Sequence, residues 1–196
     1  MDFAFVVDSS GSIKDKGAGN WDTVKDFIKS VVKILDISEV RFSAISFGTS
    51  AFIQFGFDNG FQSKQQYYNA IDKMTYDGGS TNTTGALRLA RKSFFQDSSQ
   101  GNRLDVNDVI LLITDGNVTV ETNLYEQETR VIKALPHMKV IAVGVTHDVV
   151  QSKLEQAASD ENGRKLVYRV ENFSGLEAEV NNILSKSCTV PSSGQR

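Results

Sequence analysis

Hydrophobic residues along the chain form short continuous runs that alternate with longer stretches of helical spacing. Predominantly apolar runs cover residues 3–7, 109–114 and 139–145, as is typical of strands buried on both faces of a parallel sheet. Between residues 21 and 35 the apolar positions instead recur every three or four residues, as in a helix with one buried face. Strands that alternate with helices in this way predict an α/β fold.

The remaining elements complete a layered fold with one reversed strand. Two short strands are expected at residues 40–47 and 51–57, on either side of Gly48-Thr49-Ser50. So short a connection joins antiparallel neighbours, because a parallel crossover needs a dozen or more residues. Further helices are expected at residues 64–73, 83–95, 122–135, 149–158 and 175–185, and a last strand at 165–170. The predicted fold class is therefore α/β: a doubly wound, mostly parallel six-stranded sheet with one antiparallel edge strand and helices on both faces.

Length and composition fit one globular domain. The chain has 196 residues, of which 40% are hydrophobic and 23% charged. Its net charge of −3 provides no basic footprint, so nucleic acid is not expected as a partner. No run of about 18 apolar residues is present, so we do not expect direct membrane insertion. We assign residues 1–188 to the domain and the small, polar residues 189–196 to a linker or tail, with other domains expected in the parent chain.

Oxygen-bearing side chains gather where two predicted strands end and where one predicted helix begins. The first group follows the strand at 3–7, the second lies in the glycine-rich segment 78–83, and the third follows the strand at 109–114. The carboxyl ends of parallel strands lie on one rim of the sheet, which is where ligands bind in open α/β folds. The candidate metal ligands are Asp8, Ser10, Ser12, Thr81 and Asp115.

These ligand types point to a hard divalent cation. Carboxylate and hydroxyl oxygens suit Mg²⁺, with Mn²⁺ or Ca²⁺ as alternatives, and the absence of nearby Cys or paired His argues against zinc. Two carboxylates and three neutral hydroxyls only just balance the charge of such a cation. An open coordination position then favours an acidic group from outside, such as an Asp or Glu of a partner protein.

Each segment also has an ordinary structural interpretation. Ser9 to Ser12 and Asp115-Gly116 are typical of turns, and Ser80-Thr81-Asn82 is typical of a helix N-cap. The coincidence of all three segments in one chain favours the metal site over three unrelated turns. His137 and His147 have no partner at ligand spacing and are assigned no site.

The order Asp-x-Ser-x-Ser, then Thr, then Thr-Asp-Gly resembles the motif of the von Willebrand factor A domain family, also called integrin I domains. The likeness extends over roughly residues 2–188. It implies a Rossmann-like fold, an extracellular location, and a metal-ion-dependent adhesion site formed by the five candidate ligands. It also implies that the last helix, residues 175–185, is the element that ligation displaces in integrin-like members. For Cys188 it implies a disulfide partner upstream of Met1, with an unpaired cysteine as the alternative.

Two non-enzymatic functions remain open. The first is a metal-dependent adhesion module of a secreted or cell-surface protein that binds an acidic residue of its protein ligand. The second is a structural matrix domain that binds collagen or another matrix protein, in which the metal is mainly stabilising. The direct connection at 145–149 and Asn117 both depart from collagen-binding integrins, which have an extra helix and a Glu at these places. Catalysis is not expected, because the chain has no P-loop, Gly-x-Ser-x-Gly or dinucleotide-binding motif.

Three sequons bear on that site. They begin at Asn82, Asn117 and Asn172, and they would accept glycans in a secreted protein. The first two lie beside the proposed metal, where a sugar would obstruct a ligand. We expect these two to stay unmodified, or to be poorly glycosylated in the natural host.

Overall fold

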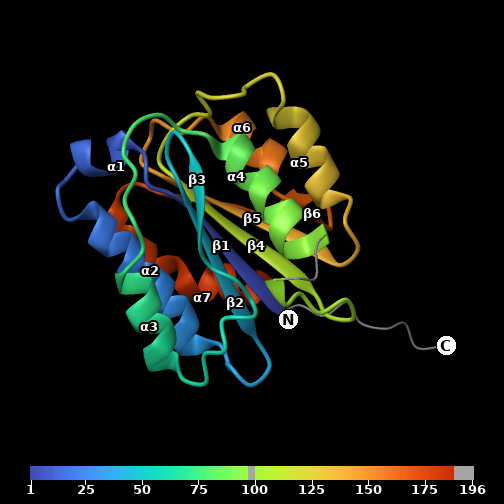
Figure 1. Cartoon of the computed structure of the whole chain (residues 1–196). Helices are drawn as coiled ribbons and strands as arrows, with labels where there is room; N and C mark the ends of the chain where they lie inside the picture. Colours follow the sequence, from blue (N-terminus) through green and yellow to red (C-terminus); the bar gives the residue numbers. More distant parts are fainter. Residues whose placement is uncertain (97–99, 188–196) are drawn as a thin grey trace.

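Six strands form one twisted sheet in the order β3-β2-β1-β4-β5-β8 (Figure 1). The structure is a computed structural model that describes residues 1–96 and 100–187, so Cys188 and the predicted tail lie outside the described residues. The strands are β1 (Asp2–Asp8), β2 (Arg41–Phe47), β3 (Ala51–Phe55), β4 (Asp108–Thr114), β5 (Met138–Val145) and β8 (Val167–Val170). All pairings are parallel except that of β2 with the edge strand β3. The predicted sheet is confirmed.

Helices cover both faces of this sheet, with α2, α3 and α7 on one side and α4 and α5 on the other (Figure 1). The helices are α1 (Gly11–Asp15), α2 (Asn20–Ile34), α3 (Lys64–Asp72), α4 (Thr83–Ala90), α5 (Tyr125–Lys133), α6 (Gln151–Ala157) and α7 (Leu176–Ser187). A short 3₁₀ turn, η3 (Phe173–Gly175), precedes α7. Because side chains alternate along a strand, β1 supplies both cores. Phe3, Phe5 and Val7 join the core under α2, whereas Ala4 and Val6 join the core under α4.

Two helix boundaries differ from the prediction by more than two residues. The helix expected at 83–95 ends its α-helical part at Ala90 and continues as the π-helical turn η1 (Arg91–Gln96). The helix expected from residue 122 begins only at Tyr125. The segment before this helix has a different backbone conformation. The N–H groups of Thr119 and Val120 both donate to the carbonyl of Thr81, and Glu121 has a φ of 53°, which is not helical.

The last predicted strand divides into two elements. Only Val167–Val170 joins the main sheet, while β7 (Arg164–Lys165) pairs with β6 (Asp160–Glu161) in a separate two-stranded hairpin. Asn162 and Gly163 form its turn with φ of 54° and 76°, and an Asn-Gly pair favours such a backbone. The prediction overlooked this turn signal.

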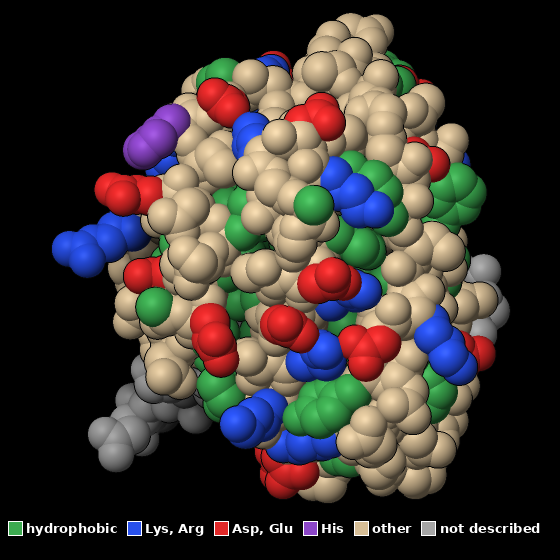
Figure 2. All heavy atoms as spheres, turned by 90° about the vertical axis from the view of Figure 1, so that its left-hand side faces the viewer, with side chains coloured by type: hydrophobic (Ala, Val, Ile, Leu, Met, Phe, Trp, Pro, Cys, Tyr) green, Lys and Arg blue, Asp and Glu red, His purple; other side chains and the backbone are tan. Residues whose placement is uncertain are grey.

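The surface over α2 and α3 mixes both signs of charge (Figure 2). Ion pairs along it include Lys25 with Asp22 at 2.8 Å, and Lys29 with both Asp26 and Asp72 at 2.8 Å. Exposed pairs of this kind contribute little to stability individually, but they leave no single-sign patch on this face. Within residues 1–96 and 100–187, none of the helices has the length and apolar character needed to cross a bilayer.

A buried acidic pair lies at the start of the two central strands. Asp2 and Asp108 are neighbours in the β1–β4 register, and both are buried. Arg103 compensates Asp2 through bonds of 2.6 and 2.8 Å from its guanidinium, whereas Asp108 Oδ1 has no hydrogen-bond partner. Burial, and next the charge of Asp2, raise the pKa of Asp108 to about 7.

Asp108 should therefore make stability fall as pH rises from about 4 to about 7. The unfolded chain releases this proton near its ordinary pKa of 3.8, while the folded chain holds it to about 7, so folding is favoured at the acidic end. Asp108→Asn should remove that slope and raise the free energy of unfolding at pH 8. Urea denaturation across this range measures the slope, with the exposed Asp105→Asn as control. An unchanged slope in Asp108→Asn would contradict the assignment.

Candidate metal centre

The two candidate carboxylates are brought together by the pairing of β1 with β4. The strands run parallel with Val7 opposite Ile113, so both end at the same rim. Asp8 is the last residue of β1, and Asp115 follows directly after β4. In the sheet, β2 lies on one side of β1 and β4 lies on the other. The strand order therefore reverses at β1, and ligands of open α/β sheets bind at such a point.

Hydroxyl groups connect the first and third segments. Ser10 Oγ and Ser12 Oγ lie 3.1 Å apart, and Ser12 Oγ donates to Asp115 Oδ1 over 2.7 Å. Ser10 also donates its backbone N–H to Asp8 Oδ1 over 2.9 Å. Four of the five predicted ligands thus form one continuous polar chain, although more than a hundred positions separate Asp8 from Asp115 in the sequence.

Thr81, the fifth predicted ligand, reaches the same place from the start of α4. The hydroxyls of Thr81 and Ser12 both lie next to Gly116. A Cβ built on this glycine would be 3.4 Å from Thr81 Oγ1 and 3.8 Å from Ser12 Oγ. Thr81 donates its N–H to Thr119 Oγ1 over 2.8 Å, and Thr119 returns its own N–H to the Thr81 carbonyl over 3.0 Å. The neighbouring Asn82 caps α4, as the N-cap interpretation predicted. The cap and the candidate ligand are adjacent residues.

Backbone bonds hold the second segment against the first. Gly11 N–H donates to the Gly79 carbonyl over 3.0 Å, and Gly78 N–H donates to the Ser9 carbonyl over 2.8 Å. The hydroxyl of Tyr76 donates to the Ser10 carbonyl over 2.8 Å. Main-chain hydrogen bonds and the Tyr76 hydroxyl therefore hold the first and second segments together.

Asp8 is almost fully buried, which affects its charge. Burial raises its pKa to about 6, although hydrogen bonds from Ser10 and Thr114 oppose the shift. The Thr114 hydroxyl donates to Asp8 Oδ2 over 2.6 Å. A cation beside this carboxyl would favour its ionised form and lower the pKa again.

Lys16 is a residue of the site that the sequence analysis missed. Its ammonium lies 3.0 Å from Asp115 Oδ2 and 2.9 Å from Asp148 Oδ2. Burial alone would lower the pKa of Lys16, but hydrogen bonds to the carboxylates of Asp148 and Asp115 outweigh it and raise the pKa. No sequence pattern links these three residues, because the contact depends on the way three loops meet.

The donor set fits a hard cation. The rim offers two carboxylates and three hydroxyls, and Asp115 Oδ2 is buried without an aligned hydrogen bond even though the Lys16 ammonium is close. Across the described residues, no three His, Cys, Asp or Glu side chains gather as cation ligands. A cation at this rim would therefore depend on the serine and threonine hydroxyls. Ser10, Ser12, Thr81, Asp8 and Asp115 are the residues that would hold it.

The amides of two sequons near this rim are already engaged. The Asn82 side chain donates to the Thr49 carbonyl over 3.1 Å and accepts from Gly85, and Asn117 Oδ1 accepts from the Val150 N–H over 2.9 Å. These bonds fix both side chains beside the site. A glycan on Asn82 would compete with its bond to Thr49.

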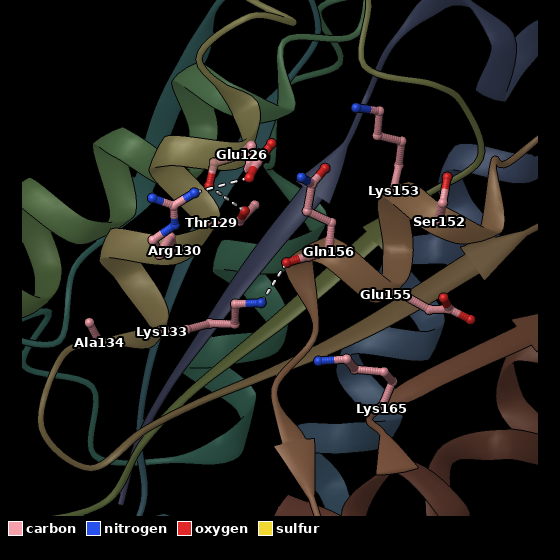
Figure 3. A pocket seen from close by; sticks show the side chains of 10 residues that line it. All are labelled: Glu126, Thr129, Arg130, Lys133, Ala134, Ser152, Lys153, Glu155, Gln156 and Lys165. Atoms are coloured by element: carbon pink, nitrogen blue, oxygen red, sulfur yellow. Dashed lines mark hydrogen bonds and ion pairs between the residues drawn. The ribbon is translucent and has the colours of Figure 1, made fainter. Parts of the chain in front are cut away.

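A groove between α5 and α6 has none of the predicted ligands among its lining residues (Figure 3). Charged side chains of the groove form hydrogen bonds and ion pairs with neighbouring groups of the same domain. Lys133 Nζ donates to the Gln156 carbonyl over 2.6 Å, and Arg130 pairs with Glu126 at 3.0 Å. The groove thus mixes both signs of charge.

Comparison with known proteins identifies the class. The family model of the von Willebrand factor type A domain matches residues 2–182, and the chain belongs to this family. It is 31% identical to human vitrin over 193 residues and 30% identical to the mouse collagen alpha-5(VI) chain over 190 residues. Each match covers 96% of this chain but only 26% and 7%, respectively, of the relative, so the chain spans a small part of these longer proteins.

A solved neighbour is proximal thread matrix protein 1 from the mussel byssus. It aligns with a TM-score of 0.88 and 26% identity over 96% of this chain and 48% of its own. A second structure of that protein, at a TM-score of 0.84 and 28% identity over 95% of this chain and 45% of its own, has a zinc-occupied MIDAS motif, the metal-ion-dependent adhesion site. A divalent metal at such a motif is therefore compatible with this fold. Zinc, which the ligand types argued against, occupies it in that neighbour.

A substitution at Gly48 would test how tightly the loops at this rim are packed. A Cβ there would lie 2.2 Å from the Gly78 carbonyl oxygen and 2.5 Å from Asp77 Oδ2, so Gly48→Ala must push the second segment away. We expect a loss of about 1–3 kcal/mol of unfolding free energy, the usual cost of overpacking. Urea denaturation measures it. Gly19→Ala is the matched control, because nothing lies within 4 Å of its Cβ position. Equal stability of the two variants would contradict this packing.

Proposed function

We propose that this domain is a metal-ion-dependent adhesion module, and not an enzyme, of a secreted or cell-surface protein. It binds Mg²⁺, with Mn²⁺ or Ca²⁺ as alternatives, and through that cation an acidic residue of a protein ligand. The observation that carries the proposal is the meeting of five oxygen-bearing side chains from three distant segments at one rim.

The chemistry follows from the charges of the donors. Ser10, Ser12 and Thr81 contribute neutral hydroxyls, and only Asp8 and Asp115 contribute negative charge. A divalent cation held this way is only just neutralised, and it provides a Lewis-acidic position for a further oxygen ligand. The bond from Ser12 to Asp115 and the burial of Asp8 hold the carboxylates in fixed orientations. The external ligand therefore meets a site that is already ordered.

The relatives support an extracellular setting. They include collagen VI chains, an integrin alpha chain and a mussel byssus matrix protein, each much longer than this domain. We therefore propose a matrix or cell-surface location for the parent chain, with an exposed Asp or Glu of a matrix protein, collagen included, as the ligand.

A second candidate function is structural assembly within a matrix. The likeness to a byssal thread matrix protein favours it. In that case the domain contacts collagen or another matrix chain through other surfaces, and the metal chiefly stabilises the rim. The two functions differ in whether binding needs the cation.

Asp115→Asn should abolish metal binding while the domain stays folded. The amide keeps the shape of the side chain and can still accept from Ser12, but it removes one of only two negative ligands. Isothermal titration of chelator-treated protein with Mg²⁺ and Mn²⁺ measures the effect, and we expect one ion per wild-type domain. Asp22→Asn, an exposed residue on α2, is the matched control. Unchanged affinity in Asp115→Asn would refute the proposed site.

Binding to immobilised collagen, measured with and without a chelator, distinguishes the two candidate functions. For the adhesion module, surface plasmon resonance should show binding in Mg²⁺ that disappears in EDTA and in Asp115→Asn, because the cation forms the contact. Binding that persists in EDTA would instead support matrix assembly. No binding under either condition would remove collagen as the partner and leave the metal titration as the test of the site.

A further inference from the structure

The ammonium group of Lys16 is surrounded by oxygen atoms at the edge of the proposed metal site. Its Nζ lies 3.0 Å from Asp115 Oδ2, 3.0 Å from the Asp115 carbonyl oxygen, 3.1 Å from Thr146 Oγ1 and 2.9 Å from Asp148 Oδ2. Two of these four contacts involve Asp115, which the proposed function makes a metal ligand. Lys16 thus binds the same residue that the cation would bind.

Lys16 reaches this position from the first metal segment itself. It caps the C-terminus of α1, only four residues after Ser12, so its backbone position is tied to the hydroxyl ligands. Its side chain is one quarter exposed, whereas the Asp115 side chain is fully buried and that of Asp148 is 71% exposed. The ammonium therefore lies between a buried carboxylate and a solvated one.

The buried carboxylate needs a positive partner in both states of the site. A buried charge is costly unless it is paired, and at Asp115 the nearby positive charge is that of Lys16. A divalent cation would supply the same compensation more strongly. The ammonium must then either move towards Asp148 and solvent or stay and repel the cation, and both alternatives weaken metal binding.

We propose that Lys16 is a built-in counter-ion of the empty metal site: it stabilises the metal-free domain and lowers the affinity for the divalent cation. This inference rests on the proposed function, since it concerns the same site. It means that the domain stays folded without metal and takes up the cation only at higher concentration. The exposed Asp148 gives the displaced ammonium a second carboxylate to bind.

Lys16→Gln tests the proposal by two independent measurements. Isothermal titration with Mg²⁺ and Mn²⁺ should show binding that is about tenfold tighter, because the variant removes one positive charge beside the cation in a site where solvent and salt screen the repulsion. In EDTA the thermal midpoint of the variant should be lower than that of wild type, because Asp115 loses its positive partner. Lys16→Arg keeps the charge and should keep both wild-type values.

Lys14→Gln is the matched control. It removes the same charge two positions earlier, where the ammonium lies 4.0 Å from the centre of the Tyr76 ring. Its metal affinity should remain at the wild-type value, because the effect depends on contact with Asp115 and not on net charge. Equal tightening in Lys14→Gln and Lys16→Gln would overturn the proposal.

The remaining outcomes separate this proposal from the function on which it rests. If wild type and Lys16→Gln bind metal equally or the variant binds more weakly, the counter-ion role is wrong while the metal site stands. If only the variant binds, or if it is unfolded in EDTA and folds when Mg²⁺ is added, both ideas are supported. If no variant binds either cation, the metal site itself fails and the counter-ion role fails with it.

Discussion

The parallel pairing of β1 with β4 is the constraint on which the rest of the site depends. These two strands lie side by side in the middle of the sheet and are buried along their whole length. Their burial fixes their register, because a slip by one residue would turn every side chain to the opposite face. Asp8 and Asp115 are therefore neighbours at the rim because of hydrophobic packing several residues away, and no attraction between the two carboxylates is needed.

The hydroxyl ligands are positioned by a different kind of interaction. Main-chain hydrogen bonds between the first and second segments, such as that from Gly11 to Gly79, hold the loops together. The clamp between Thr81 and Thr119 joins the second segment to the third and delays the start of α5. Because buried main-chain groups must be paired, these bonds make the loops part of the fold. The loops that carry the candidate ligands are thus held together by the fold itself.

The two ends of the central strands balance buried negative charge in different ways. At the start of β1, the guanidinium of Arg103 pairs with Asp2 through several bonds, and Asp108 remains protonated up to a raised pKa. At the far end, the flexible Lys16 contacts Asp115 from the side of solvent. The planar guanidinium of Arg103 fits a carboxylate through a rigid fork, whereas the Lys16 ammonium is a point charge on a flexible stem that can turn between Asp115 and Asp148. This contrast is consistent with one end serving stability and the other serving exchange of a cation.

The sequence by itself determined the order of the elements, the reversed edge strand and the two carboxylates on one rim, because each depends on local periodicity and on general rules of strand connection. It also marked Ser10, Ser12 and Thr81 as candidate ligands, since their motif is contiguous or adjacent to a helix start. Only the tertiary structure decided that Thr119 clamps Thr81, that residues 122–124 lie outside α5, and that Lys16 contacts Asp115. These contacts join loops that are tens to a hundred residues apart, and loop backbones have no periodic pattern from which their meeting could be predicted.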